Sequence, residues 1–283
     1  MSEWPLAVFT LAIQLSCGLA LAATLSDWSG GHSDVGMRPL GIAIFPLAAV
    51  GMLASLLHLG RPLSAWKSLY NLGTSRLSLE VLLTLLFVLA ALMYSHSWWA
   101  HRPDHRVATG VATSLLALAA VASSTTVYLI PTQPAWNAGW VPASFFGTAL
   151  LLGGTASAAF VGLRGPRDLL GCFLAGTVAG GLMLLASTVW MLAALSRVPL
   201  DDFAAARMQE ALHLLTSQHA VALGLHLLLA TVIPIAFAAL IWSGRSAPGP
   251  PPWLRLLVFL AISLGAFIGR NLMYFVVTLP RQF

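Results

Sequence analysis

Hydrophobic residues run in long blocks that no charged residue interrupts. The blocks free of Asp, Glu, Lys and Arg are Trp4–Ser26, Pro39–Gly60, Val81–His101, Val107–Leu163, Leu169–Ser196 and Ala211–Gly244. A helix needs about 20 apolar residues to cross the hydrocarbon core of a bilayer, so each block is long enough to form a span. The blocks do not alternate apolar and polar residues over ten-residue segments, which favours membrane-spanning helices over a β-barrel.

Two of the apolar regions decide the number of spans. The block 107–163 is about twice as long as one span requires, and prolines and a glycine interrupt its centre at 131–142, so it predicts two helices. A last apolar segment, Trp253–Leu279, contains Arg270. We therefore predict an all-α integral membrane protein with one transmembrane domain over residues 1–283. The eight expected spans are 5–25, 40–59, 77–96, 107–129, 143–163, 169–195, 213–242 and 253–279.

The composition agrees with a bilayer as solvent. Hydrophobic residues make up 58% of the sequence and charged residues 8%, against about 25% charged residues in soluble domains. No Lys or Arg precedes Arg38, so we expect the first span to be retained, since secretory signals begin with positive charge. The pairs Gly153-Gly154 and Gly180-Gly181 favour close helix packing.

An even number of spans puts both termini on one side of the membrane, together with the loops 60–76, 130–142 and 196–212. We name this side the terminal face. Lys and Arg residues divide almost evenly between the loops of the two sides, so the positive-inside rule does not orient the protein. The net charge of +5 fits an anionic lipid surface and an acidic protein partner equally well. We expect no nucleic-acid partner.

Cysteine content limits the redox chemistry of the protein. Cys17 and Cys172 are the only thiols, and both fall inside expected spans. An iron–sulfur cluster normally takes four thiolate ligands, so two cysteines are too few to hold one without a partner. A structural zinc site is excluded in the same way. We interpret both cysteines as small buried apolar residues.

Ionisable residues at membrane depth are candidates for function, because each costs about 2.5–3.5 kcal/mol to insert at the centre of a span. His58 ends the second expected span and Glu80 lies one turn into the third, so both emerge at the terminal face. A neutral imidazole accepts a proton from a quinol hydroxyl near physiological pH, and a carboxylate beside it can hold or relay that proton. The residues alone leave a second interpretation open, in which both side chains lie at the membrane surface and form hydrogen bonds only with water and the loop.

Three further polar residues lie in the last two spans. His219 and His226 are about two turns apart on one face of the seventh span. They could each ligate a haem only if a facing helix supplied partners, and polar packing inside the bundle is the favoured interpretation. Arg270 either reaches toward the interface or pairs inside the bundle. The adjacent Trp98 and Trp99 are interpreted as anchors at the membrane interface.

Several short segments resemble one known family. They are Glu3–Thr10, Ser55–Pro62, Leu77–Glu80, the loop from Tyr128 to Phe146 with its prolines and tryptophans, and Gly269-Arg270 with Met273-Tyr274. They resemble the membrane anchor subunit of bacterial anaerobic dimethyl sulfoxide reductase. The His-Leu-Gly-x-Pro motif that begins at His58, with Glu80 following it, is the more specific part. The matches extend over the whole sequence and imply a shared eight-span architecture.

The resemblance implies a quinol-oxidising membrane subunit with no activity of its own outside its complex. Such anchors take electrons from menaquinol and pass them to a ferredoxin-like subunit with four [4Fe–4S] clusters, which feeds a molybdopterin catalytic subunit. The anchor itself binds no haem and no cluster. The complex sits in the bacterial inner membrane, among its lipids, and an export signal on the catalytic subunit puts the terminal face in the periplasm.

The same resemblance assigns the residues of the site. The quinol site would contain His58 and Glu80. Residues around the quinol would be Gly60, Arg61, Trp66 and Tyr70. Residues that dock the cluster subunit would be Lys67, Arg76, Trp136 and Trp140. The family often has an acidic residue where this sequence has Ala266, so no second proton route is carried over.

Three alternatives remain at this point. The same architecture could run in reverse and reduce quinone for a molybdoenzyme that oxidises a sulfur compound. A haem b anchor is the second, and a secondary transporter is the third. A transporter would carry helix breaks at matching positions of its two halves; Pro46 and Pro234 are the breaks in question.

Overall fold

The computed structural model describes residues 4–29, 34–57, 59, 61–131, 133, 135–161, 167–196, 203–243 and 250–278. The α-helices are α1 (Trp4–Trp28), α2 (Asp34–Leu56), α3 (Arg76–Trp99), α4 (Arg106–Tyr128), α5 (Trp140–Val161), α6 (Arg167–Ser196), α7 (Phe203–Thr216), α8 (Ala220–Leu227), α9 (Ile233–Ser243) and α10 (Pro252–Thr278). Within the described ranges, 8 helical segments are long and apolar enough to cross a membrane. The prediction of an all-α protein with eight candidate spans is confirmed.

The seventh span begins later than the sequence pattern predicts. We expected 213–242, whereas one helix, α7, ends at Thr216 and the span itself runs from Ala220 to Ser243. The Ser217 hydroxyl donates to the carbonyl oxygen of His213 at 2.6 Å, and the His219 amide donates to Leu214 O at 2.9 Å. These bonds satisfy carbonyls at the end of α7 and turn the backbone before α8 starts.

A π-helical segment, Leu228–Val232, joins α8 to α9 within this span. Pro234 follows it and has no amide hydrogen to give to the preceding turn. The wider turn therefore lies where the regular hydrogen-bond ladder is already interrupted. Pro46 lies inside the continuous helix α2, the second span of the first four, whereas Pro234 lies in the third span of the last four. The two prolines therefore do not occupy matching positions.

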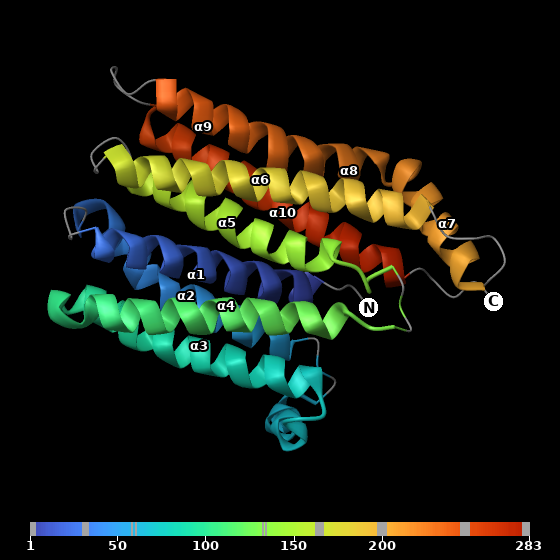
Figure 1. Ribbon diagram of the computed structural model, residues 1–283, viewed down its shortest axis with the longest axis horizontal. Helices are drawn as coiled ribbons and strands as arrows, with labels where there is room; N and C mark the ends of the chain where they lie inside the picture. The colour runs from blue at the N-terminus through green and yellow to red at the C-terminus, as the bar shows by residue number, and fades with distance from the viewer. Residues whose placement is uncertain are drawn as a thin grey trace.

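The helices form two four-span halves that lie side by side (Figure 1). The first half contains α1–α4, and the second contains α5, α6, the α8–α9 span and α10. Helices α1 and α5 meet at the centre, where Gly18 faces Gly153. A Cβ atom added to Gly153 would overlap the Cα of Gly18, so the two backbones touch and neither position has room for a side chain. Gly154 and Gly180 bring α5 equally close to α6, which confirms the expected role of the glycine pairs.

A hydroxyl from α3 forms hydrogen bonds with backbone groups of α2 next to Pro46. The amide of Phe45 donates to Ser95 Oγ at 3.0 Å, and this hydroxyl donates in turn to Gly41 O at 2.9 Å. Ser95 thus stands between a donor and an acceptor that would otherwise bond within α2. A proline is tolerated inside a span because a neighbouring helix satisfies the freed backbone groups.

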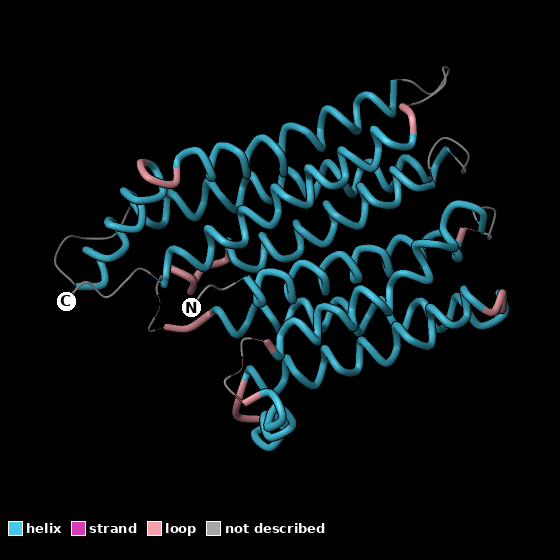
Figure 2. The backbone as a smooth tube through the Cα atoms, turned by 180° about the vertical axis from the view of Figure 1, so that it is seen from behind, coloured by secondary structure: helices cyan, strands magenta, loops and turns pink. Residues whose placement is uncertain are grey.

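The beginning of α1 and the end of α10 lie at the same end of the bundle, which is the terminal face defined above (Figure 1). A 3₁₀ helix, η1 (Pro62–Asn71), connects α2 to α3 and projects from this end of the first half (Figure 2). None of its residues is buried. The terminal face therefore carries a short helix that contacts α3 and leaves many of its side chains exposed.

Candidate functional site

Glu80 is buried close to the terminal face. Gly73 turns the backbone before α3 with a φ of 99°, a conformation that favours glycine. Ser75 then caps the helix, because its side chain accepts from the amide of Ser78 at 3.3 Å. Glu80 follows one turn later, is 6% exposed, and lies beside the Ser124 hydroxyl of α4. An acidic side chain is thus held inside the bundle near its end.

His58 and Gly60 lie outside the described residues. Helix α2 ends at Leu56 and the neighbouring α3 begins at Arg76, both at the terminal face. The loop that contains His58 therefore starts at the end of the bundle that holds Glu80. The pairing of these two side chains stays a prediction.

Two tyrosines in the neighbourhood of Glu80 bond to each other across the two halves. The hydroxyl of Tyr128 in α4 lies 2.9 Å from that of Tyr274 in α10. Both side chains are buried, and Glu80 is close enough for its charge to act on each of them. Trp136 covers the pair, stacking edge-on against Tyr128 at 5.1 Å and donating from Nε1 to Met273 O at 2.9 Å. The carboxyl group of α3 and the phenols of α4 and α10 thus form one buried cluster.

Arg270 extends this cluster deeper into the membrane. It is 4% exposed and donates from Nη2 to the Oε1 atom of Gln14 at 2.9 Å. Its guanidinium carbon lies 3.8 Å from the centre of the Phe145 ring. The sequence left open whether Arg270 reaches toward the interface or pairs inside the bundle. The structure shows that it lies inside the bundle. We name Glu80, Tyr128, Tyr274, Arg270 and Gln14 the inner polar group.

The predicted quinol residues of the loop are exposed rather than enclosed. Trp66 is 56% and Tyr70 is 70% exposed, and their rings stack edge to face at 5.2 Å. Arg61 is also exposed, just before η1. Trp66 and Tyr70 lie on the projecting helix η1, which contacts α3. That these residues take part in a quinol site stays a prediction.

The four residues expected to dock a partner differ in what they contact. Lys67 is exposed on η1, with its Nζ atom 5.8 Å from the Trp66 ring. Arg76 is exposed, but its guanidinium donates to the carbonyls of Thr126 at 3.0 Å and of Leu129 at the end of α4. Trp136 is half-buried over Tyr128, whereas Trp140 is 2% exposed and donates to Ala135 O. Trp140 therefore offers no surface to a partner.

His219 and His226 do not form a stacked pair. His219 precedes α8 as its N-terminal flanking residue and packs on Phe275 with ring centres 4.2 Å apart. His226 is buried, with Nδ1 2.8 Å from Gly265 O and Nε2 3.2 Å from Thr188 Oγ1. The polar packing expected for His226 is confirmed. In the described part of the sequence, no group of three or more His, Cys, Asp or Glu residues could hold a metal ion.

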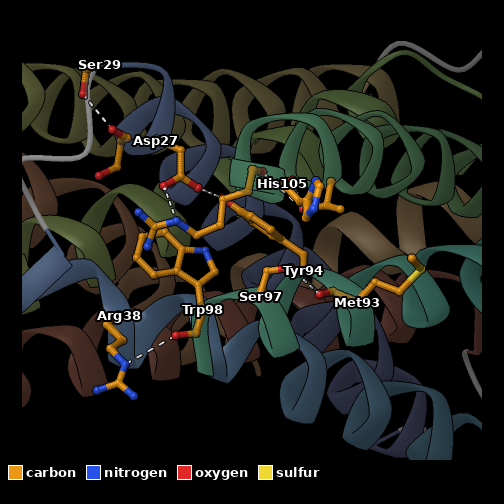
Figure 3. A network of polar contacts seen from close by, with 11 residues as sticks. Asp27, Ser29, Arg38, Met93, Tyr94, Ser97, Trp98 and His105 are labelled. Atoms are coloured by element: carbon orange, nitrogen blue, oxygen red, sulfur yellow. Dashed lines mark hydrogen bonds and ion pairs between the residues drawn. The ribbon is translucent and has the colours of Figure 1, made fainter. Parts of the chain in front are cut away.

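A second buried cluster lies at the opposite end of the first half (Figure 3). Arg106 Nε is 3.2 Å from Asp27 Oδ1, and the Tyr94 hydroxyl donates to Asp27 Oδ2 at 2.7 Å. The Arg106 guanidinium also lies 4.0 Å from the centre of the Trp98 ring. Trp98 is only 1% exposed, so its interpretation as an interface anchor is wrong; Trp99, at 63%, is exposed.

The sequence comparison decides the family. The model of the DMSO reductase anchor subunit (DmsC) family matches residues 1–276. The chain belongs to this family. It is thus a multi-pass membrane protein and the membrane anchor subunit of a complex of dimethyl sulfoxide reductase type. The family expected from the short motifs is confirmed.

Among its relatives, the C subunit of the anaerobic dimethyl sulfoxide reductase of Escherichia coli is 27% identical over 96% of this protein and 94% of that subunit. The E. coli anaerobic dimethyl sulfoxide reductase subunit YnfH is 34% identical, over 58% of this protein and 59% of the relative. The C subunit of the Haemophilus influenzae reductase is 30% identical over 56% and 58%. The protein thus aligns with nearly all of the E. coli C subunit and with somewhat more than half the length of the other two relatives.

Several polar contacts of this DmsC family member are not evident from its motifs. Gln14 stands alone as an amide in the apolar first span, which was a usable signal for an interior hydrogen bond. Asp27 and Arg106 carry opposite charges at the ends of spans on the same side. Their pairing required knowledge that α1 and α4 are neighbours.

Proposed function

We propose that this protein oxidises menaquinol in the bacterial inner membrane and passes the electrons to an iron–sulfur subunit. That partner would carry four [4Fe–4S] clusters and feed a molybdopterin catalytic subunit. Membership in the anchor family supports this function, and so do the family motif at His58 and the acidic residue Glu80. The observation that carries the proposal is the burial of Glu80 beside the Ser124 hydroxyl, at the end of the bundle where the His58 loop begins.

The chemistry needs only proton acceptors from the anchor. Oxidation of a quinol releases two protons and two electrons and leaves a quinone. His58 holds one quinol hydroxyl and accepts its proton, and Glu80 accepts the second proton or takes over the first. The electrons leave to a cluster in the partner subunit, so the redox chemistry belongs to the quinol and the clusters. The Ser124 hydroxyl beside Glu80 can hold its charged form by hydrogen bonding.

A matched pair of carboxylate variants tests the role of Glu80. Glu80→Gln keeps the size of the side chain and removes the proton acceptor. Quinol-dependent reduction by the assembled complex should fall by about 100-fold or more, while reduction with an artificial dye, which bypasses the anchor, keeps its rate. Glu210→Gln, which changes an exposed carboxylate of α7, is the control and keeps both rates. Normal quinol turnover by Glu80→Gln would exclude Glu80 from the reaction.

The same assay with His58→Gln tests the role of His58. Its quinol-dependent rate should fall while its dye-dependent rate stays unchanged. Direction is tested by supplying a reduced quinol analogue in one experiment and a quinone with a reduced catalytic subunit in another. Faster turnover in the second experiment would assign the protein to quinone reduction instead. A reduced-minus-oxidised visible spectrum of the purified complex distinguishes the haem alternative.

The projecting helix η1 is our proposed docking surface for the iron–sulfur subunit, on the periplasmic side of the membrane. It exposes Trp66 and Tyr70 next to Lys67, and Leu63 is 93% exposed. The segment from Arg61 to Arg76 contains no acidic residue. An aromatic and basic surface fits a partner with acidic residues around an exposed cluster edge. Copurification of the iron–sulfur subunit with Lys67→Glu and with wild-type anchors measures this contact.

A further inference from the structure

A small cavity lies inside the second half, and Arg270 of the inner polar group is one of its lining residues. Its volume is about 30 Å³, counted over the positions open to the centre of a water-sized sphere. A water needs about 10–15 Å³ by this measure, so the cavity has room for one or two waters or for one somewhat larger particle, and for no organic ring. Helices α5, α6, α8 and α10 enclose it, and its polar lining residues are Ser144, Thr148, Ser187, Thr188, His226 and Arg270.

Arg270 gives the cavity a positive charge. The guanidinium is 4% exposed, and its Nε atom has no hydrogen-bond partner. Its other contacts are the neutral Gln14 amide, the Met273 sulfur and the Phe145 ring. No acidic side chain lines the cavity among the described residues, and Arg270 forms no ion pair with a described carboxylate. A buried cation without a counter-charge is strongly unfavourable in a low-dielectric interior.

The hydroxyl groups around the cavity can donate to a ligand. Ser144 and Thr148 donate to carbonyls of α5, namely Val141 O at 2.8 Å and Ser144 O at 2.7 Å. Ser187 donates to Trp140 O at 2.9 Å. These carbonyls also accept the amides of the helix itself, so a hydroxyl can rotate toward the cavity without leaving a carbonyl unpaired.

His226 fixes the shape of the site and adds no negative charge. A carbonyl only accepts hydrogen bonds, so the contact to Gly265 O places a proton on Nδ1. Nε2 lies 3.2 Å from Thr188 Oγ1, whose hydroxyl also lies within hydrogen-bonding distance of Leu184 O. The ring also lies directly over Gly269, where an added Cβ would overlap a ring carbon. The imidazole therefore forms a wall that joins α6, α8 and α10.

We propose that this cavity binds one small monovalent anion, of the halide class, with Arg270 as its counter-charge and the hydroxyls of Ser144, Thr148 and Ser187 as further donors. The anion accepts from the free Nε–H of Arg270 and neutralises a charge that the bilayer interior does not tolerate. Water could accept the same hydrogen bond but leaves the charge uncompensated. The role of the ion is structural: it stabilises the second half of the bundle.

Thermal unfolding of the purified full-length protein in detergent tests the site, with chloride as the probe. The unfolding midpoint should rise with chloride concentration and then level off, because a ligand that binds only the folded state stabilises it by mass action. Gluconate at equal ionic strength is the control and gives no saturable rise. Coincident chloride and gluconate curves would overturn the proposal.

Bromide locates the ion directly. Crystals of the full-length protein or its complex grown with bromide should show an anomalous peak within hydrogen-bonding distance of Arg270 Nε. A cavity that holds only water, with bromide confined to the surface, would overturn the assignment even if chloride stabilised the protein. This measurement uses the unaltered sequence and therefore does not depend on how well any variant folds.

Two variants connect the chloride effect to the cavity. Gln14→Glu places a carboxylate at the position of an atom that now lies 2.9 Å from Arg270, so the built-in counter-charge should abolish the chloride-dependent shift. Arg255→Met is the matched control, because Arg255 also lies in α10 but binds Ala159 O away from the cavity. It should keep the full shift. A shift that survives in Gln14→Glu, or is lost in Arg255→Met, would place the chloride effect elsewhere.

Discussion

The hydroxyl of Tyr128 lies 2.9 Å from the hydroxyl of Tyr274 and joins helices that belong to different halves of the bundle. The contact is buried and continues toward Glu80 on one side and Arg270 on the other. The two halves are therefore joined by a hydrogen bond between side chains as well as by the glycine contact between α1 and α5. A buried hydrogen bond between halves makes their relative placement part of the site.

A double-mutant cycle measures the Tyr128–Tyr274 contact. Tyr128→Phe and Tyr274→Phe should each lower the free energy of unfolding by about 1–3 kcal/mol, because the remaining buried hydroxyl loses a partner. The double variant should cost less than the sum, with a coupling of about 1 kcal/mol. Chemical unfolding in mixed micelles gives the three values. Strictly additive losses would show that the hydroxyls are not coupled.

Arg76 and Lys67 should separate stability from docking. Arg76→Gln removes donors from the last carbonyls of α4 and should cost about 0.5–1.5 kcal/mol of stability, while partner copurification changes little. Lys67→Glu changes an exposed charge with no such backbone contact, so its stability should stay within about 0.5 kcal/mol, while copurification of the iron–sulfur subunit falls. The reverse pattern would assign docking to Arg76 and make η1 a structural element.

Most spans were predictable because charged side chains are costly in lipid, so long stretches without them mark the spans. Prolines divided the block 107–163, and the last span was predicted although it contains Arg270. The break before Ala220 was not predictable in this way. In the turn between α7 and α8, the hydroxyl and the amide of Ser217 both donate to the carbonyl oxygen of His213. Neither residue is an Asp, Glu, Lys or Arg, so the turn does not interrupt the charge-free block. The same break removes His219 from the helix, so helical periodicity wrongly aligned it with His226.

The candidate site was predictable only in part, because its contacts cross between helices. The position of Glu80 one turn inside α3 follows from the sequence, and its burial against Ser124 requires the rotation of α3 relative to α4. Trp140 shows the opposite error: it begins α5 beside a loop, yet it points inward and lines the cavity. Which side of a helix faces a neighbour depends on packing that a nearly uniform apolar pattern does not record.

Gly269→Ala should disturb α8 and α10 through one defined contact. The added methyl group would collide with the His226 ring, and overpacking of this kind costs about 1–3 kcal/mol. Adding His226→Ala should recover part of the loss by removing the ring. Unfolding of the single and double variants decides this. If Gly269→Ala is as stable as the wild type, the close packing of the imidazole on α10 is incorrect.

Asp27 and Arg106 provide a structural ion pair far from the proposed quinol site. Asp27→Asn leaves the Arg106 guanidinium without its counter-charge at 3.2 Å, and loss of one partner of a buried pair costs about 3–5 kcal/mol. The double variant Asp27→Asn with Arg106→Gln removes the isolated charge and should be more stable than Asp27→Asn alone. Unfolding curves give the order of stabilities, and assembled complexes of the double variant should keep the wild-type rate of quinol oxidation per complex. The rate should stay unchanged because the pair lies at the opposite end of the bundle from Glu80. A selective loss of the quinol-dependent rate in the double variant would mean that this end of the bundle takes part in the reaction.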